Sequence, residues 1–386
     1  MAEQLTDAVL RQRGIDPEQY QRLRSRAARE IDEGLLPAAQ IALAREGELL
    51  ATESFGGATE ESLFCIFSAT KAVTSGAIWL LLQEGKLELQ ERVVDIIPDF
   101  ATNGKDAVLV EHLLTHTAGF PHAPFRPLDW NDPERRAQRF AQWRLQWPPG
   151  TQFEYHPSSS MWVLAEIIER RSGSDYREFV RQRVLDPLGL SDFYVGLIPD
   201  AVQTRVLPCV HSGAPMTDAD YVAAGLPVPP ESEVTEDAIL SFNEPAVRNV
   251  GVPGGGGVTS AAALALYHQA LLHGGRNGNS LWQPDMLAAA RRVHSGELAD
   301  PMFRKRANRG LGLIIAGDED RTYRGFGKTN SSRAFGHNGA GGQIAWVDPD
   351  SGLSFAYVTS GHDRNSVRQA RRGVALSSIA AGCSLQ

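Results

Sequence analysis

Two stretches at opposite ends of the chain, each able to form two strands joined by a tight turn, most constrain its fold. Residues 38–57, AAQIALAREGELLATESFGG, place the turn Arg45–Gly47 between two apolar-rich segments. Residues 342–361, GQIAWVDPDSGLSFAYVTSG, repeat this arrangement around DPDSG, whose residue types favour turns. Residues 1–34 and 364–382 show the spaced apolar residues of helices. The pattern predicts an α+β fold, with an antiparallel sheet built from both chain ends and flanked by helices.

The middle of the chain has a different, mainly helical pattern. Three segments with helical apolar spacing, at 158–173, 175–189 and 259–275, each end in glycine or Pro-Leu-Gly. Long proline-rich connections join such segments, and loops of that length are often functional. We therefore expect a sheet lobe made of residues 1–67 and 291–386, and an inserted helical lobe made of residues 68–290.

Composition narrows the classes of function. The chain has 386 residues, a formal net charge of −8, and 42% hydrophobic and 22% charged residues. No polybasic segment favours nucleic acid or a membrane surface as a partner. The three cysteines, Cys65, Cys209 and Cys383, fit neither a disulfide framework nor a zinc site and suit a reducing compartment. With no apolar signal segment and no run of about eighteen apolar residues, we expect a cytoplasmic protein.

The segment FSATKAVTSGAIWLLLQEG (residues 67–85) places a serine and a lysine three residues apart at the head of an apolar helix. If the helix begins at Ser68, Lys71 lies one turn later on the same face. A helix N-terminus supplies free N–H donors, and a nearby base can make a serine nucleophilic. Taken alone, these four residues fit an N-cap serine and a lysine that extends to solvent better than a catalytic pair.

Further segments strengthen the catalytic interpretation. The strings FSATKAVTSGAIWLLLQEGKLELQERVVDIIPDF, VEHLLTHTAGF, PPGTQFEYHPSSSMWVLAEIIERRSG and RAFGHNGAGGQIAWVDPDSG occur in this order. Together they resemble the serine β-lactamase-like superfamily, which includes class C β-lactamases, D-Ala-D-Ala carboxypeptidases, D-aminopeptidases and the family VIII esterases. The resemblance covers about residues 35–360, which is nearly the whole chain.

The resemblance implies a role for each matching residue. Ser68 corresponds to the nucleophile, Lys71 to its basic neighbour, and Tyr155 to a general base that works with the lysine. A free phenol, with a pKa of about 10, needs an adjacent cation to act as a base near neutral pH. The N–H groups of Ser68 and Ala340 correspond to the oxyanion hole. His337, Asn338 and Gly339 correspond to the third motif, which borders the substrate.

Two departures from the family pattern bear on the substrate. The second motif reads Tyr155–His156–Pro157 where many relatives have Tyr-x-Asn, and the third reads His337–Asn338–Gly339 where many have Lys-Thr-Gly. Histidine is mostly neutral at pH 7, so the cation that recruits a substrate carboxylate is missing. The departures favour neutral esters. The sequence Lys328–Thr329–Asn330 also resembles Lys-Thr-Gly, but no clear strand follows it, so we reject it as the third motif.

Three other features receive structural interpretations. His112 and His116 are four residues apart, as metal ligands on a helix are, but no third ligand is evident, and HLLTHTAGF also fits a helix end and a turn packed beneath the nucleophile. The glycine-rich stretch 252–260 lacks the lysine of a phosphate-binding loop, and we expect a tight backbone passage near the site. No G-x-S-x-G motif occurs, so the nucleophile elbow of α/β-hydrolases is absent.

Aromatic residues gather at positions 120–147, and most are expected to pack the helical lobe. Phe120, Phe125 and Trp130 are candidates for the wall of an apolar acyl pocket, because small-molecule sites are usually lined by such side chains. Packing within the lobe is the equally weighted alternative.

The sequence thus predicts a serine esterase that hydrolyses short-chain carboxylic esters through an acyl-enzyme. The expected partner is a small-molecule ester, with no metal and no organic cofactor; the oligomeric state is undetermined. Three alternatives stay open. They are an amide hydrolase (β-lactamase, D-aminopeptidase or carboxypeptidase), an acyltransferase, and a non-catalytic binding protein on the same scaffold.

Overall fold

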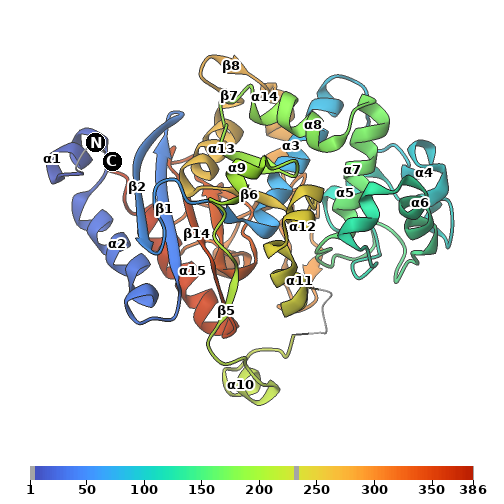
Figure 1. Cartoon of the computed structure of the whole chain (residues 1–386). Coiled ribbons are helices and arrows are strands. Elements are labelled where there is room, and N and C mark those ends of the chain that lie inside the picture. The colour runs from blue at the N-terminus through green and yellow to red at the C-terminus, as the bar shows by residue number, and fades with distance from the viewer. Residues whose placement is uncertain (1–4, 230–233, 386) are drawn as a thin grey trace.

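The computed structural model describes residues 5–229 and 234–385. Its main sheet has six strands in the order β11-β12-β13-β14-β1-β2, and every neighbouring pair is antiparallel. The strands are β1 (Ala38–Arg45), β2 (Glu48–Gly56), β11 (Ile314–Ile315), β12 (Phe335–Gly336), β13 (Ile344–Val347) and β14 (Ser354–Thr359). N-terminal β1 lies beside C-terminal β14 (Figure 1). The predicted sheet of both chain ends, with its two hairpins, is confirmed.

The alternation of side chains along β1 explains how both faces of the sheet are covered. Ala39, Ile41 and Leu43 belong to a core shared with α2 (Pro17–Asp32) and α15 (Ser366–Ala381). The intervening alanines of β1 face the opposite side and pack with α13 (Ala261–His273). Successive side chains of a strand point to opposite faces, so a strand that is apolar on both faces, apart from Gln40 and the terminal Arg45, fits between two helical layers.

Caps in the sequence set the ends of these covering helices. Asp16 accepts hydrogen bonds from the first turn of α2, and Pro17 occupies its first position. Ser260 caps α13, and Asn365 caps α15. Such side chains satisfy N–H groups that have no partner within the helix. A short helix, α1 (Asp7–Gln12), precedes α2.

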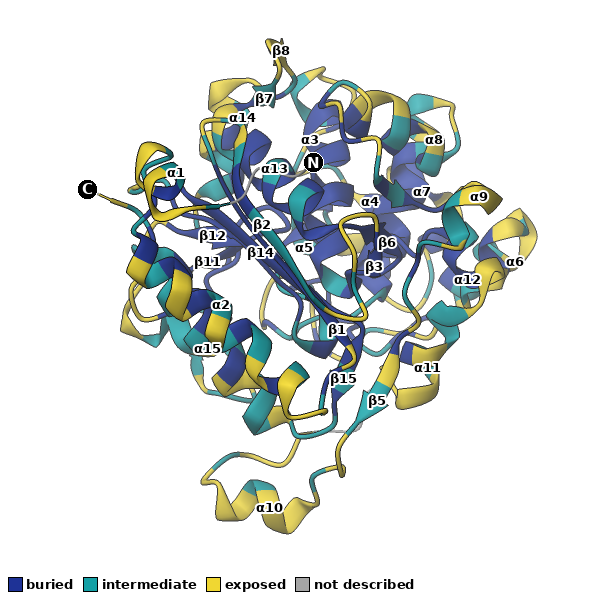
Figure 2. Ribbon diagram, turned by 60° about the vertical axis from the view of Figure 1, so that its left-hand side comes forward, coloured by how far each residue is buried: buried dark blue, intermediate teal, exposed yellow. Residues whose placement is uncertain are grey.

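The helical region packs around α3 (Lys71–Gln83), whose residues are buried on all sides from Lys71 to Leu81. It contains α4 (Val93–Ile96), α5 (Val110–Leu114), α6 (Pro133–Gln142), α7 (Ser159–Ser172) and α8 (Tyr176–Val180), which a π-helical turn (Arg181–Leu185) extends. Figure 2 shows α3, α5, α7 and α13 as mainly buried and α10 as exposed. One apolar core runs from the sheet face through α13 and α3 to α7. The division into a sheet lobe and a helical lobe stays a prediction. Helix α13 packs on the sheet, although its residues belong to the predicted helical lobe of 68–290.

Shorter elements complete the chain. The remaining helices are α9 (Asp200–Gln203), α10 (Asp218–Ala223), α11 (Glu236–Leu240), α12 (Pro245–Val250) and α14 (Pro284–Arg291). Further strand pairs join β3 (Phe64–Cys65) and β4 (Phe193–Val195) to β6 (Gly257–Thr259), β5 (Val210–Ser212) to β15 (Gly361–Asp363), β7 (Gly275–Arg276) to β8 (Asn279–Ser280), and β9 (Ala299–Asp300) to β10 (Lys305–Arg306). Short 3₁₀ turns occur at Phe67–Thr70, Pro98–Phe100, Lys105–Ala107, Pro127–Asn131, Ser241–Asn243, Glu319–Arg324 and Ala340–Gly342.

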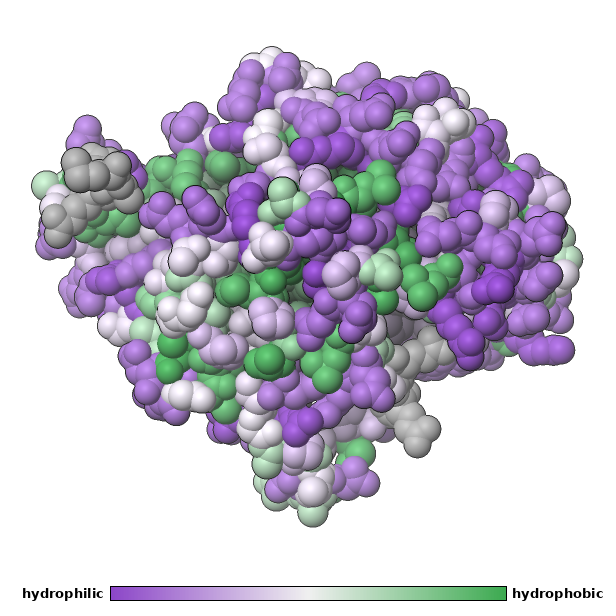
Figure 3. All heavy atoms as spheres, in the orientation of Figure 1, coloured by the Kyte–Doolittle hydropathy of each residue, from purple (hydrophilic) through white to green (hydrophobic). Residues whose placement is uncertain are grey.

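The face of the molecule seen in Figure 3 is mainly hydrophilic, and apolar residues gather toward the middle of this face. Helix α10 projects from the body of the molecule in both ribbon views (Figures 1 and 2). Among the described residues, no helix combines the length and the low polarity that crossing a bilayer requires.

Candidate active site

Ser68 lies where the helical region meets the sheet, in the 3₁₀ turn Phe67–Thr70 that leads into α3. The backbone of the preceding residue, Phe67, has a φ of 45°. A left-handed conformation is unfavourable for a bulky residue and is found mostly at functional sites. The expected start of the helix at Ser68 is thus a tighter turn, and the α-helix itself begins at Lys71.

Lys71 is fully buried and its ammonium nitrogen contacts three oxygen atoms. Nζ lies 3.1 Å from Ser68 Oγ, 2.7 Å from the Pro157 carbonyl oxygen and 2.8 Å from the Gly254 carbonyl oxygen. Burial lowers the pKa of Lys71; attraction to Tyr155 opposes this shift and the charge of Arg309 adds to it.

This arrangement suits a proton acceptor. The two carbonyls can only accept hydrogen bonds, so they hold two N–H groups of Lys71 in either protonation state. The third position faces Ser68 Oγ. There the charged form donates a hydrogen bond, and the neutral amine offers its lone pair to the serine proton.

The backbone of Gly254 lies so close to Lys71 that a larger residue would be crowded there. A Cβ there would stand 3.3 Å from Lys71 Nζ and 3.1 Å from the side chain of Met161. The expectation that the glycine-rich stretch 252–260 makes a tight passage near the site is confirmed. It supplies a backbone carbonyl, and nothing in the arrangement requires a phosphate.

Tyr155 lies beside Lys71, whose Nζ is 5.0 Å from the centre of the phenol ring. The Tyr155 hydroxyl is buried and makes no hydrogen bond of full geometry among the described residues, but it lies close enough to Lys71 for the two groups to attract each other. Two imidazole rings flank the phenol. The centre of the Tyr155 ring lies 4.8 Å from that of His116 and 6.0 Å from that of His337. A buried polar group without a full hydrogen bond is costly, and a role in the reaction is one explanation for keeping it.

His337 follows β12 and lines the same cleft. Its Nδ1 lies 2.8 Å from the Asn338 carbonyl oxygen, to which it donates, and its buried Nε2 therefore carries a lone pair without a partner among the described residues. Burial holds the pKa of His337 well below its ordinary value, and the charges of Lys71 and Arg309 lower it further. The imidazole is therefore neutral.

Asn338 and Gly339 also border the cleft, but they shape it through the backbone. The Asn338 amide donates to the Gly325 carbonyl at 2.9 Å and accepts from the Ala345 N–H at 3.2 Å, so both of its ends are occupied. A Cβ at Gly339 would stand 2.1 Å from the Ile66 carbonyl oxygen. Only glycine permits this approach between the third motif and the segment before Ser68.

That approach bears on the predicted oxyanion hole. Ser68 and Ala340 both line the cleft. Stabilisation of an oxyanion requires two N–H donors that face the same cavity, and these two residues border one. This assignment stays a prediction.

His156, which stands where many relatives have asparagine, points into the core. Its ring accepts a hydrogen bond from the Phe120 N–H at 3.2 Å, and its backbone N–H donates to His116 Nδ1, also at 3.2 Å. Burial lowers the pKa of His156 to about 3. This neutral side chain fixes the loop that carries Tyr155 and does not line the cleft.

The three aromatic residues considered for an acyl pocket follow the alternative interpretation, which is packing within the helical region. Phe120 and Trp130 are buried in the core of the helical region, and Phe125 packs against that core. Phe125 stacks on Trp162 with ring centres 4.4 Å apart, and Trp130 stacks on the same residue at 5.2 Å. None of the three lines the cleft that contains Ser68. Aromatic side chains gain much free energy when their large apolar surface is buried, and Phe125 and Trp130 bury theirs against Trp162 of α7.

The structure also resolves the remaining motif candidates. Helix α5 ends at Leu114 and His116 has a φ of 58°, so His112 and His116 do not share a helical face. Among the described residues, no group of three or more His, Cys, Asp or Glu could hold a metal ion. Lys328 lies against α15, where its N–H donates to Ser378 Oγ, which confirms its rejection as a motif lysine.

Two side chains near Tyr155 have roles that sequence reasoning missed. The Arg309 guanidinium carbon lies 5.4 Å from the Tyr155 ring centre, and the His116 ring packs against the same phenol. Burial lowers the pKa of Arg309, and burial together with the charge of Arg309 holds the pKa of His116 well below its ordinary value. No signal marks Arg309 in the sequence, because it belongs to no motif. His116 was considered as a metal ligand or as part of a turn packed beneath the nucleophile, and its contact with Tyr155 was not predicted.

These residues surround a cleft with a volume of about 1080 Å³. Ser68, Tyr155, His337 and Ala340 lie on its wall, together with Arg309. The structure therefore brings together the predicted nucleophile, phenol and third motif, with Lys71 buried directly behind Ser68.

Comparison with known proteins identifies the family. The Beta-lactamase family model matches residues 23–378. "Esterase/beta-lactamase LipL" of Mycobacterium tuberculosis is 26% identical over 305 residues, covering 76% of this chain and 68% of that protein. A penicillin-binding protein homologue from Caulobacter crescentus has a TM-score of 0.77 at 28% identity, covering 96% of this chain and 99% of that one. A family VIII carboxylesterase has a TM-score of 0.78 at 26% identity with the same coverage.

The match spans nearly the whole chain and agrees with the sheet and helix arrangement described above. The predicted fold class and the predicted superfamily are confirmed. The chain belongs to the beta-lactamase family and is a serine hydrolase of that superfamily.

Proposed function

We propose that this protein is a family VIII-like serine esterase that hydrolyses short-chain carboxylic esters through an acyl-enzyme. The observation that carries the proposal is the position of Lys71, with Nζ 3.1 Å from Ser68 Oγ and its other contacts held by two carbonyls. The similarity to proteins named as an esterase/beta-lactamase and as a family VIII carboxylesterase supports ester chemistry.

In the proposed reaction, Ser68 Oγ attacks the ester carbonyl carbon while its proton passes to neutral Lys71, so Lys71 takes the role of base that the family resemblance implies for Tyr155. The Ser68 and Ala340 N–H groups stabilise the oxyanion. Tyr155, beside Lys71, delivers a proton to the leaving alcohol oxygen. Water then attacks the acyl carbonyl while Tyr155 takes back a proton from it. Lys71 returns its proton to Ser68 Oγ, and the carboxylic acid is released. The mechanism uses only groups of the chain itself.

The state of the third motif favours esters over β-lactams and peptides. His337 is neutral, with its pKa held well below the ordinary value by burial. His156 is directed into the core and offers no amide to a substrate. An ester has a better leaving group than an amide and depends less on such contacts.

The test is a substrate panel measured on wild type, Ser68→Ala and Tyr155→Phe. The panel holds 4-nitrophenyl esters of graded acyl length, a chromogenic cephalosporin and a D-aminoacyl anilide. We expect the highest kcat/KM on short acyl esters, near-complete loss in Ser68→Ala, and a loss of about 100-fold in Tyr155→Phe. Faster turnover of the lactam or anilide than of any ester would contradict the proposal.

The proposed partner is a small-molecule ester, and the proposed location is the cytoplasm. All three cysteines are free and buried thiols, as expected in a reducing compartment. Growth of a tagged strain followed by fractionation checks the location, and recovery in the periplasm would contradict it.

A further inference from the structure

The direction of the Tyr155 side chain is decisive for the proposed reaction, because its hydroxyl has to lie beside Lys71 and reach the leaving alcohol. The hydroxyl makes no hydrogen bond of full geometry among the described residues, so it does not fix its own position. The direction of the phenol therefore depends on the backbone that carries it and on the groups packed against its ring. A displacement of about 1 Å in a reacting group can cost about 100-fold in rate.

One residue, His116, holds the backbone on both sides of Tyr155. The Glu154 N–H donates to the His116 carbonyl oxygen at 3.3 Å, and the His156 N–H donates to His116 Nδ1 at 3.2 Å. The imidazole also packs against the phenol, with ring centres 4.8 Å apart and ring planes inclined by 52°. His116 thus contacts three consecutive residues, and Tyr155 is the middle one.

His116 is itself held in place. It is 2% exposed, and its backbone has a left-handed φ of 58°, two residues after the end of α5. The next residue, Thr117, donates its N–H to the His112 carbonyl oxygen at 2.9 Å and accepts the Gly150 N–H at 2.8 Å. A left-handed backbone costs free energy in a histidine and persists only where the surroundings fix it. The end of α5 is therefore a firm support for the loop that carries Tyr155.

The contact with His156 also determines where the His116 ring carries its proton. A backbone N–H can only donate, so Nδ1 has to offer a lone pair, and the proton of the neutral ring lies on Nε2. Burial holds the pKa of His116 well below its ordinary value, and the charge of Arg309 lowers it further. The ring is therefore a neutral acceptor near pH 7, and its contact with the loop is not lost to protonation there.

We propose that His116 is a positioning residue for the reaction: by accepting the N–H groups of the residues before and after Tyr155, it directs the phenol to Lys71 and to the leaving alcohol. His116 transfers no proton and binds no part of the substrate, so its whole effect passes through Tyr155. The inference rests on the proposed esterase function. It adds to that function a residue outside the motifs that contain Ser68, Tyr155 and His337.

The test uses two acetate esters that differ in their need for the Tyr155 proton. Benzyl alkoxide is a poor leaving group and has to be protonated as it leaves, whereas 4-nitrophenoxide leaves readily without a proton. Both esters form the same acetyl-enzyme, so their kcat/KM values compare the acylation step. Release of acetic acid from benzyl acetate, and of 4-nitrophenol from 4-nitrophenyl acetate, is followed for wild type and for each variant at one pH.

The variant His116→Phe keeps an aromatic ring but removes the acceptor for the His156 N–H. We expect its kcat/KM to fall about 10-fold to 100-fold for benzyl acetate and less for 4-nitrophenyl acetate, with the same leaving-group dependence in Tyr155→Phe. In the double variant the loss should match that of Tyr155→Phe alone within about 3-fold, because the hydroxyl through which His116 acts is already gone.

Two further variants separate positioning from a general role in folding. His116→Asn places Oδ1 where Nδ1 stood and tolerates the left-handed backbone, so it should keep kcat/KM within about 5-fold of wild type. His112→Phe is the matched control. His112 Nδ1 also accepts a backbone N–H, that of Leu109 at 3.1 Å, but it does so at the start of α5. Its loss should change kcat/KM by less than about 3-fold for both esters.

Each outcome has one meaning. Losses that multiply in the double variant, equal losses on the two esters, or a His116→Asn variant no better than His116→Phe would overturn the inference. The esterase proposal would stand in each of these cases, because wild type would still hydrolyse both esters. If His116→Phe does not fold, His116→Ala takes its place in the same comparison. A wild type that hydrolyses neither ester would refute the esterase proposal itself.

Discussion

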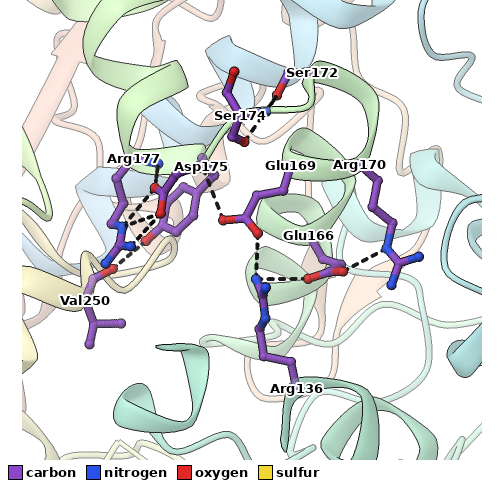
Figure 4. Close-up of polar contacts among 10 residues, drawn as sticks. Arg136, Glu166, Glu169, Arg170, Ser172, Ser174, Asp175, Arg177 and Val250 are labelled. Atoms are coloured by element: carbon purple, nitrogen blue, oxygen red, sulfur yellow. Dashed lines mark hydrogen bonds and ion pairs between the residues drawn. The ribbon is translucent and has the colours of Figure 1, made fainter. Parts of the chain in front are cut away.

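Two regions of this molecule remove cations partly or wholly from solvent, and they treat the charge in opposite ways. In the helical region, Arg136 Nη1 lies 2.7 Å from Glu169 Oε2 and 3.1 Å from Glu166 Oε2, and Arg170 Nε is 2.8 Å from Glu166 Oε1 (Figure 4). In the cleft, no carboxylate of the described chain forms an ion pair with Lys71 or Arg309.

The difference separates stability from chemistry. Paired charges that also satisfy neighbouring groups, as Glu169 does for the Tyr176 N–H, hold elements together. Figure 4 shows this pairing continuing to Asp175 and Arg177. Lys71 instead contacts two carbonyls and a hydroxyl, which leave its charge uncompensated and its pKa lowered. A cation held in this way can exchange a proton or bind an anion.

The largest expected effect is on catalysis. Lys71→Met removes the proposed proton acceptor from Ser68, and we expect kcat/KM for 4-nitrophenyl acetate to fall about 1000-fold or more. Steady-state kinetics at one pH, with circular dichroism as a check on folding, measures it. A folded variant that keeps a tenth of the wild-type activity would mean that Lys71 is not the base.

The paired region should respond in the converse way. Arg136→Met leaves the carboxylates of Glu166 and Glu169 without their shared cation, and we expect a loss of about 3 kcal/mol in the free energy of unfolding. Urea denaturation measures the loss, and kcat of the folded enzyme should be unchanged. Adding Glu166→Gln and Glu169→Gln should restore part of the stability, because the unpaired charges are then removed.

The pH dependence of activity tests the protonation state of Lys71. Burial lowers its pKa below the ordinary value of 10.5, so the neutral amine forms at a lower pH than for an exposed lysine. If the neutral amine accepts the serine proton, kcat/KM should rise about 10-fold per pH unit below that pKa and then level off. A rate that falls across this interval would show that the ammonium form is the active one.

The smallest effect is expected for an exposed pair. Arg29 on α2 and Glu33, which directly follows this helix, have side chains 63% and 64% exposed, with the nearest atoms 3.9 Å apart. Arg29→Met should change the free energy of unfolding by less than about 0.5 kcal/mol, because solvent screens such pairs. A change above 1 kcal/mol in urea denaturation would weaken the contrast drawn between paired and exposed charges.

Features of the fold and of the site could be predicted from the sequence where they depend on residues close together in the chain. The two hairpins depend on local turn chemistry and on alternation, and both were predicted. Ser68 and Lys71 were paired correctly because three residues span one helical turn. Tyr155 and His337 joined them through resemblance to a family, since no local rule brings segments so distant into contact.

The features that the sequence did not decide depend on contacts between distant segments. An aromatic residue such as Phe125 fits a pocket wall and a core equally well in sequence, and only the packing of α7 decides between them. Arg309 belongs to no motif. It lies shortly before the edge strand β11, and the fold brings its guanidinium to the Tyr155 ring. Whether a charged residue is buried, and whether it has a partner, depends on the assembled fold.

The most direct test of the account is to trap the acyl-enzyme. Wild type is mixed with excess 4-nitrophenyl acetate, quenched in acid within the first turnover, digested and analysed by mass spectrometry. The account predicts one acetyl group on the peptide that contains Ser68 and none on Ser68→Ala treated identically. Acetylation of another residue at the same rate, or ester hydrolysis by wild type without any covalent adduct, would contradict it.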